Sequence, residues 1–296
     1  MEVLRFNTSC ISCIFNKFLK SVPSNTDEFT RLRYAKDIMR IIADANDNTS
    51  APEIVAECTK LKNETFGVSD DFAELKLHFN QLMLSFEKDI SLKISRSTDR
   101  IRSALYYALL GNYIDFGAMD NVDEGKLSTL IDEAENINID TNEFLNLCTD
   151  LKKSHSLVYL TDNCGEIVFD KLFINEIIRQ FPNLKVTVLV RGENVLNDAT
   201  LQDAKQVGLT EIVPVLGNGT GIAGTCIDLL PNEIREIVCG ADVLIAKGQG
   251  NFETLCYSHK NIYYLFMCKC KLFSDRFHVE PLSPMLLNDL RIKQIT

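Results

Sequence analysis

The hydrophobic pattern predicts helices along the first half of the chain. In residues 27–45, 51–66, 70–90 and 97–115, apolar side chains recur every three or four positions, the period of an amphipathic helix. Strand-like alternation is scarce here. Residues that favour helix starts lie near three of these segments: Thr26 or Asp27, Pro52, and Ser97 or Thr98. We therefore expect a helical bundle or cap domain over residues 1–150.

From about residue 155 the pattern changes to short β-rich runs separated by helical stretches. The β-rich runs lie at 156–162, 185–192, 211–217, 241–248 and 261–268, and helical periodicity returns at 166–181 and 194–208. Apolar strands that alternate with helices indicate a largely parallel sheet covered on both faces. We expect residues 151–296 to form an α/β domain of three α/β/α layers with a mostly parallel, Rossmann-like sheet, on which the helical half packs directly.

Polar residues follow three of the predicted strands. The sequence places them as Asp162, Asn163, Gly165 and Glu166 after the first strand, Asn197 and Asp198 early in the helix after the second, and Lys247, Gly248, Gly250 and Asn251 at the turn after the fourth. In open α/β sheets, ligands bind in the crevice beyond the carboxyl ends of the strands. The three segments are therefore expected to converge at one edge of the sheet.

The residue types at this edge indicate a metal beside a phosphate. Asp162, Asn163 and Asp198 supply two carboxylates and an amide oxygen, hard ligands that suit Mg²⁺ or Mn²⁺. Lys247 and its glycine-rich turn could hold a phosphate, assisted by backbone N–H groups at the helix start. Each segment alone is also explained as a turn and helix cap. Their coincidence at three strand ends favours a site for phosphoryl chemistry.

Composition and charge narrow the class of protein. The 296 residues carry a formal net charge of -10, which argues against nucleic acid as the main partner. No apolar run approaches the roughly 20 residues that a membrane helix needs, and the first residues lack the pattern of a signal peptide. Ten cysteines in such a chain are typical of reduced thiols, so we expect a cytoplasmic protein without a membrane partner. The oligomeric state is left open.

Four segments carry a resemblance to a known family. In order and spacing, "LTDNCGEIVFD", "VRGENVLNDATLQDA", "ADVLIAKGQGNFETL" and "YYLFMCKC" resemble the damage-control phosphatases, formerly a domain of unknown function (number eighty-nine). The "CISC" and "LLGNYIDFG" segments are similar as well, closest to the archaeal and bacterial branch with an N-terminal cysteine pair. The resemblance spans nearly the whole chain, and its specificity comes from D-N-x-G-E and K-G-x-G-N-F-E together.

The resemblance implies a metal-dependent phosphatase that acts on phosphorylated metabolites, such as sugar phosphates or damaged cofactor intermediates. The metal would be Mn²⁺, Co²⁺, Ni²⁺ or Mg²⁺. Carried over to this chain, the family pattern implies three metal ligands, Asp162, Asn163 and Asp198. It also implies that Lys247 binds the phosphate, with Asn251 nearby.

The family pattern extends into the helical half, and it is broken at one place. Asn112 and Asp115 are implied to face the site across the junction of the two halves. Glu193 and Asn194 stand where relatives often have small residues or proline. An extra carboxylate near the pocket could change substrate preference.

Several roles stay open in the sequence. Asp162 is either a metal ligand only or also a covalent nucleophile. Glu166 either orients a ligand or water, or is a favourable acid in the first turn of a helix. The alternatives to a phosphatase are an S-adenosylmethionine-dependent protein carboxyl methyltransferase and a non-catalytic metabolite-binding protein. The single glycine of "TDNCGE" fits the methyltransferase poorly.

The cysteines allow a second metal site only if the chain ends meet. Cys10 and Cys13 have the spacing of half a zinc site, and Cys268 and Cys270 could supply the rest. We favour reduced thiols that pack as small apolar side chains. Cys164 has no sequence neighbour that would activate it, and we expect a space-filling role.

Overall fold

The computed structural model describes residues 6–46, 48–67, 72–113 and 124–292. Within these ranges, the helices are α1 (Thr8–Lys20), α2 (Glu28–Asp44), α3 (Ala51–Phe66), α4 (Ala73–Arg96), α5 (Arg100–Tyr113), α6 (Glu124–Asp132), α7 (Thr141–Lys153), α8 (Glu166–Gln180), α9 (Leu201–Gln206), α10 (Asn232–Gly240), α11 (Gly248–Leu255) and α12 (Lys271–Phe277). The strands are β1 (Ser156–Leu160), β2 (Lys185–Val190), β3 (Val215–Gly217), β4 (Val243–Lys247), β5 (Ile262–Met267) and β6 (Pro284–Asn288).

The six strands form one sheet in the order β3-β2-β1-β4-β5-β6. All neighbouring pairs are parallel except β5 and β6, which are antiparallel. The strand order reverses between β1 and β4, so the loops after these two strands leave the sheet in opposite directions and open a crevice. The predicted fold class, a mostly parallel α/β sheet with helices on both faces, is confirmed.

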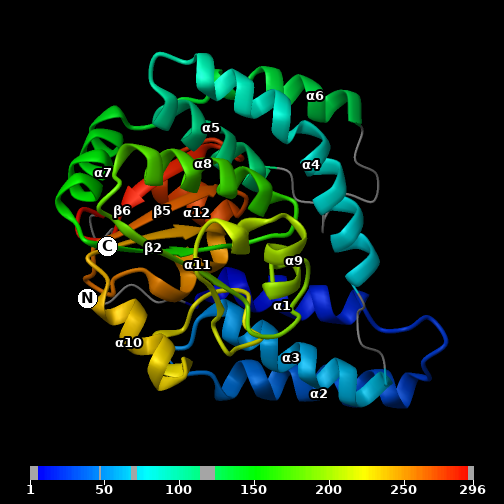
Figure 1. The fold of residues 1–296 in the computed structure, drawn as a ribbon. Helices are drawn as coiled ribbons and strands as arrows, with labels where there is room; N and C mark the ends of the chain where they lie inside the picture. The colour runs from blue at the N-terminus through cyan, green and yellow to red at the C-terminus, as the bar shows by residue number, and fades with distance from the viewer. Residues whose placement is uncertain (1–5, 47, 68–71, 114–123, 293–296) are drawn as a thin grey trace.

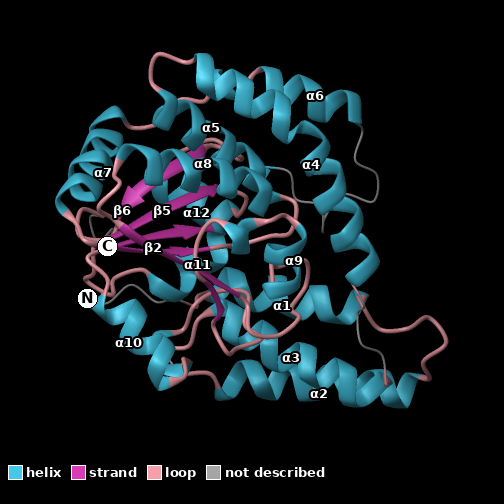
Figure 2. Cartoon of the chain, in the orientation of Figure 1, coloured by secondary structure: helices cyan, strands magenta, loops and turns pink. Residues whose placement is uncertain are grey.

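Helices cover the two faces of the sheet with separate hydrophobic clusters (Figures 1 and 2). On one face, Tyr159 of β1 packs edge-on against Phe173 of α8, with ring centroids 6.4 Å apart. On the other, Phe252 of α11 contacts Tyr264 and Phe266 of β5 at centroid distances of 5.0 and 5.1 Å. Strands buried on both faces explain the near-continuous apolar runs in the sequence.

The helices of the first half do not pack as one bundle. Those from α4 to α7 share a hydrophobic cluster with α8 and the sheet. By contrast, α1, α2 and α3 bury their apolar side chains in a cluster of their own, and α3 contacts α11. Figure 1 shows these three helices grouped apart from α4–α8. A division into domains at residue 150 stays a prediction.

Local capping explains where the helices begin. Of the two residues that the sequence proposed for the start of α2, Thr26 and Asp27, it is Asp27 that caps the helix. Its carboxylate accepts a hydrogen bond from the Thr30 N–H. The start of α5 differs from the prediction. Asp99, rather than Ser97 or Thr98, caps this helix, because its carboxylate accepts from the Arg102 N–H at 3.2 Å.

The segment 194–208 is less helical than its periodicity predicted. Only α9 forms there, because Thr200 and Asp203 make a capping box that starts the helix after residue 200. Asn197 and Asp198 therefore lie in the preceding loop, not early in a helix. Within the described part of the chain, no helix combines the length and apolarity needed to cross a membrane.

Candidate functional site

A cavity of about 590 Å³ lies at the carboxyl edge of the sheet, beside the reversal of strand order. Six of its lining residues were selected from the sequence: Asn112, Asp162, Asn163, Asn197, Asp198 and Gly250. Lys17 of α1, Lys62 of α3 and Lys269 after β5 also line it. The structure thus brings residues of α1 and α3, of α5, and of the loops after the strands to one cavity, although they are far apart in the sequence.

Asp162 lies at the centre of this edge because the neighbouring backbone leaves room for it. Its Oδ2 accepts hydrogen bonds from Asn112 Nδ2 at 3.0 Å and from Asn163 Nδ2 at 2.8 Å. Gly248, the first residue of α11, has a φ of +80°, and a Cβ there would lie 2.0 Å from Asp162 Oδ2. A glycine is required both for this backbone conformation and for the close approach.

The loops after β1 and β2 are joined through their backbones. Asn163 and Asp198 form an antiparallel bridge, and the Ala199 N–H donates to the Asp162 carbonyl at 2.7 Å. The Cys164 N–H donates to the Asn197 carbonyl at 2.8 Å. These bonds hold Asp162, Asn163 and Asp198 side by side.

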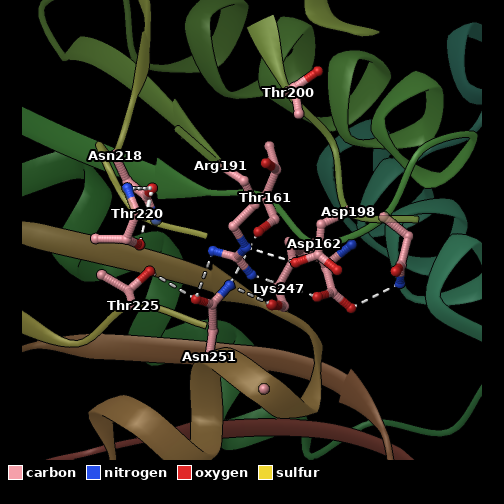
Figure 3. Close-up of polar contacts among 12 residues, drawn as sticks. Thr161, Asp162, Arg191, Asp198, Thr200, Asn218, Thr220, Thr225, Lys247 and Asn251 are labelled. Carbon is pink, nitrogen blue, oxygen red and sulfur yellow. Dashed lines mark hydrogen bonds and ion pairs between the residues drawn. The ribbon is translucent and has the colours of Figure 1, made fainter. Parts of the chain in front are cut away.

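Arg191 lies between the aspartates and Asn251 (Figure 3). Its Nε donates to Asp198 Oδ2 at 2.6 Å, and its Nη1 donates to Asn251 Oδ1 at 3.4 Å. Its Nη2 lies 3.7 Å from Asp162 Oδ1 and has no hydrogen-bond partner among the described residues. This buried guanidinium fixes Asp198 and partly offsets the negative charge of the pair.

Burial raises the pKa of both aspartates, and neighbouring carboxylates add to the shift. For Asp162, loss of water is the largest cause, followed by the charges of Asp198 and Glu166, while Arg191 and Lys269 act in the opposite direction. For Asp198, burial again outweighs the opposing effect of Arg191. Two carboxylates that repel each other in a buried place favour a cation between them.

Lys247 does not line the cavity. It is fully buried, and its Nζ donates to Glu166 Oε1 at 2.5 Å, Asp170 Oδ1 at 2.6 Å and the Ala108 carbonyl at 2.8 Å. Burial lowers the pKa of Lys247, but the carboxylates of Asp170 and Glu166 outweigh it, so the pKa is raised. The ammonium lies beneath the site, which differs from the phosphate-facing position that the sequence predicted.

Glu166 connects this buried lysine to the cavity. Its Oε2 accepts from Asn112 Nδ2 and Asn163 Nδ2, both at 3.1 Å, while its Oε1 pairs with Lys247. It is also the first residue of α8, as one of the two sequence interpretations expected. That it orients a ligand or water stays a prediction. The carboxylate supports the two amides that contact Asp162.

Two other predicted site residues, Asn251 and Glu193, do not line the cavity. Asn251 is fully buried, with its Nδ2 donating to the Lys247 and Thr161 carbonyls. Glu193 is exposed and packs beside Gly221, because the backbone N–H groups of its turn bond to Thr220. Asp115 lies outside the described residues.

Sequence reasoning missed residues that the strand-end rule would have found. Arg191 directly follows β2, and Lys269 follows β5 by two positions. It also missed Asn80 of α4, whose amide joins the loops: Oδ1 accepts from the Gly165 N–H at 2.7 Å, and Nδ2 donates to Asp203 Oδ1 at 2.9 Å. No local pattern marks Asn80, since its partners are distant in sequence.

The cysteines form no metal cluster among the described residues. Cys10 lies within electrostatic reach of Cys13 and Cys270, as the second-site hypothesis required, but Cys268 is buried with its Sγ 3.4 Å from Ser274 Oγ. Cys164 is fully buried, and burial raises the pKa of its thiol to about 12. It fills space beneath the loop after β1.

Known proteins resemble this chain over most of its length. Residues 6–282 match the damage-control phosphatase ARMT1-like domain. A damage-control phosphatase of Archaeoglobus fulgidus is 32% identical over 283 residues, covering 90% of this chain and 93% of the relative. A damage-control phosphatase of Pyrococcus horikoshii is 30% identical over 273 residues, covering 90% and 92%.

The fold agrees with these sequence matches. The crystal structure of a DUF89 family protein from Pyrococcus horikoshii superposes with a TM-score of 0.80 at 26% identity, covering 96% of this chain and 99% of that one. An uncharacterized protein of Methanocaldococcus jannaschii is 29% identical over 294 residues, covering 94% of both chains. On the match to most of its residues and on the fold that they adopt, this chain belongs to the damage-control phosphatase family.

Proposed function

We propose that this protein hydrolyses small phosphomonoesters, such as sugar phosphates or damaged phosphometabolites, with a divalent metal bound to Asp162, Asn163 and Asp198. One observation carries the proposal: two carboxylates and an amide from different loops line the same cavity as Lys269. The names of the relatives, damage-control phosphatases, support the reaction type. Mn²⁺, Co²⁺, Ni²⁺ and Mg²⁺ are the candidate ions.

The residues fit a hard divalent cation. All the candidate ligand atoms are oxygens, which suit Mg²⁺ and Mn²⁺. Co²⁺ and Ni²⁺, which also bind nitrogen ligands, can be held by oxygen ligands as well. Burial, and to a smaller extent neighbouring carboxylates, raise the pKa of Asp162 and Asp198, and Arg191 only partly opposes the shift. When bound, the metal would polarise the phosphoryl group and activate water.

The chain's own residues would position the ester. Lys269 lines the cavity and its charge acts on Asp162, which supports a role for its ammonium in binding phosphate oxygens. Asn112 and Asn163 hold Asp162 Oδ2 by their amide N–H groups. In the reaction, water attacks phosphorus directly, or Asp162 attacks first and water then cleaves the aspartyl phosphate. Either way the ester P–O bond breaks, the alcohol leaves with a proton that water supplies, and phosphate is released.

The test is phosphate release from a panel of sugar phosphates and phosphorylated cofactors, repeated with each of the four metals. We expect metal-stimulated release by the wild type, and loss of both activity and metal binding in Asp198→Asn. Asp275→Asn, at an exposed position of α12, is the matched control. The proposal fails if no metal supports release and Asp198→Asn binds metal normally. S-adenosylmethionine binding measured by calorimetry would instead favour a methyltransferase.

A further inference from the structure

Two partly buried apolar side chains line the cavity without belonging to the hydrophobic core. Leu196 lies in the loop after β2, and Phe72 directly precedes α4. Neither residue belongs to any of the three hydrophobic clusters that the described residues form. Most of the other residues that line the cavity are polar. Packing of the core therefore does not explain why these two positions are apolar.

Leu196 has a backbone conformation that leucine rarely adopts. Its φ is +48°, in the left-handed region. It is the first central residue of a turn that the Asp198 N–H closes by donating to the Val195 carbonyl at 3.0 Å. Asn197, the second central residue, is not among the described residues with positive φ. The turn thus resembles type II′, in which glycine is preferred at the position that Leu196 occupies.

The turn keeps this conformation because the residues after Leu196 are fixed to the loop after β1. The Asn197 carbonyl accepts from the Cys164 N–H at 2.8 Å. Asp198 forms the backbone bridge to Asn163. Strained residues persist where their surroundings hold them in this way, and they are frequent at functional sites. At Leu196 the strain is accompanied by the placement of the side chain in the wall of the cavity.

Leu282 has the same kind of backbone conformation away from the cavity. Its φ is +65°, and it lies in the turn that the Ser283 N–H closes on the Glu280 carbonyl at 3.1 Å. Its side chain is 41% exposed and does not line the cavity. Strain at a leucine is therefore not by itself a sign of a site. Leu196 is distinguished by its position in the cavity wall, two residues before Asp198.

We propose that Leu196 is a specificity-determining residue, and that the site selects phosphate esters whose organic part presents apolar carbon next to the phosphate. This inference rests on the proposed function, since it names the substrate class of the same site. A phosphate held at Asp162 and Asp198 places the first carbons of the ester against the Leu196 side chain. Phe72 adds a second apolar surface to the same cavity.

The physical basis of this selection is the removal of apolar surface from water. Each methylene that a ligand buries fully against apolar side chains strengthens binding by up to about fourfold. A hydroxyl group at the same place would lose water without gaining a hydrogen-bond partner from leucine. The cavity volume of about 590 Å³ leaves room for the organic part beside the phosphate.

Alkyl phosphonates, which are not hydrolysed, test the inference apart from turnover. Calorimetry on Mn²⁺-loaded protein would compare methyl-, ethyl-, propyl- and butylphosphonate. We expect the wild type to bind butylphosphonate about tenfold more tightly than methylphosphonate. Leu196→Gly, whose backbone suits the turn, should reduce this ratio to about twofold with little change in the affinity for methylphosphonate. Leu196→Asn, which also tolerates the left-handed region but presents an amide, should reduce the ratio as well.

Leu282→Gly is the matched control, because it relieves the same kind of strain away from the cavity and should keep the tenfold ratio. Urea denaturation shows that the three variants are folded. An unchanged ratio in Leu196→Gly would overturn the inference, as would equal binding of all four phosphonates by the wild type. If the wild type binds no phosphonate, the inference is overturned too. Failure of the phosphatase proposal is distinct, since phosphate release would be absent while the ratio is still measured.

Discussion

Lys247 Nζ lies 2.5 Å from Glu166 Oε1, and both side chains are fully buried. Asp170, one helical turn after Glu166, accepts from the same ammonium at 2.6 Å. One lysine thus stabilises two carboxylates beneath the cavity, and one of them holds the amides of Asn112 and Asn163. We infer from these contacts that Lys247 positions Glu166 and, through it, the two amides.

Lys247→Met should lower the free energy of unfolding by about 3–5 kcal/mol, because two buried carboxylates lose their cation. Urea denaturation measures this loss. Lys271→Met is the control, since Lys271 is exposed and pairs with Asp275 on the surface, where a change below about 1 kcal/mol is expected. A stable Lys247→Met variant with a raised KM for phosphate esters would restore the sequence-based role in phosphate binding.

Gly248→Ala should displace Asp162 and weaken metal binding. The new Cβ would lie 2.0 Å from the Asp162 carboxylate, and the backbone φ of +80° costs roughly 1–2 kcal/mol for alanine. Calorimetry with Mn²⁺ and urea denaturation measure the two effects. Gly240→Ala is the matched control, because a Cβ at the end of α10 meets no atom within 4 Å. Unchanged Mn²⁺ affinity in Gly248→Ala would contradict this account.

Asn80→Asp should destabilise the protein by about 3 kcal/mol or more. The substitution places a second carboxylate against Asp203, where Asn80 Nδ2 now donates at 2.9 Å. Asn80→Ala should cost less, about 1–3 kcal/mol, because it only leaves the Asp203 and Gly165 groups short of a partner. Thermal or urea unfolding distinguishes the two. Asn16→Asp, at an exposed position of α1, is the control, and equal effects of Asn80→Asp and Asn80→Ala would contradict the prediction.

Glu253 should make stability depend on pH. Burial raises its pKa to about 7, against 4.5 for an exposed glutamate, although a hydrogen bond from Gln249 opposes the shift. A raised carboxyl pKa means that the unfolded state releases the proton first. The contribution of Glu253 is therefore complete below about pH 4.5 and falls as the pH rises through about 7.

Glu253→Gln should remove that loss. Because the side chain keeps some contact with water, we expect the variant to gain about 1–2 kcal/mol relative to wild type on going from about pH 5 to about pH 8. Urea denaturation at both pH values gives the difference. Glu236→Gln, on the exposed side of α10, is the control. A constant difference between Glu253→Gln and wild type at both pH values would show that Glu253 does not titrate in this window.

The sequence by itself determined the sheet, the edge and three residues at that edge. Apolar runs that alternate with helical periodicity indicated a parallel sheet, and the carboxyl ends of parallel strands meet at one edge. Asp162, Asn163 and Asp198 were found by that rule and do line one cavity. Arg191 and Lys269 obey the same rule and were open to the same reasoning. The signal is local, because strand order alone brings these residues together.

The tertiary structure decided the direction of the Lys247 side chain and brought Lys17 and Lys62 to the cavity. At the end of β4, a lysine can point outward into the crevice or inward toward the helices, and burial of its ammonium requires Glu166 and Asp170 on one face of α8. Lys17 and Lys62 reach the cavity only because α1–α3 pack as a unit beside α11. Such contacts join residues far apart in the chain, and periodicity within a segment carries no information about them.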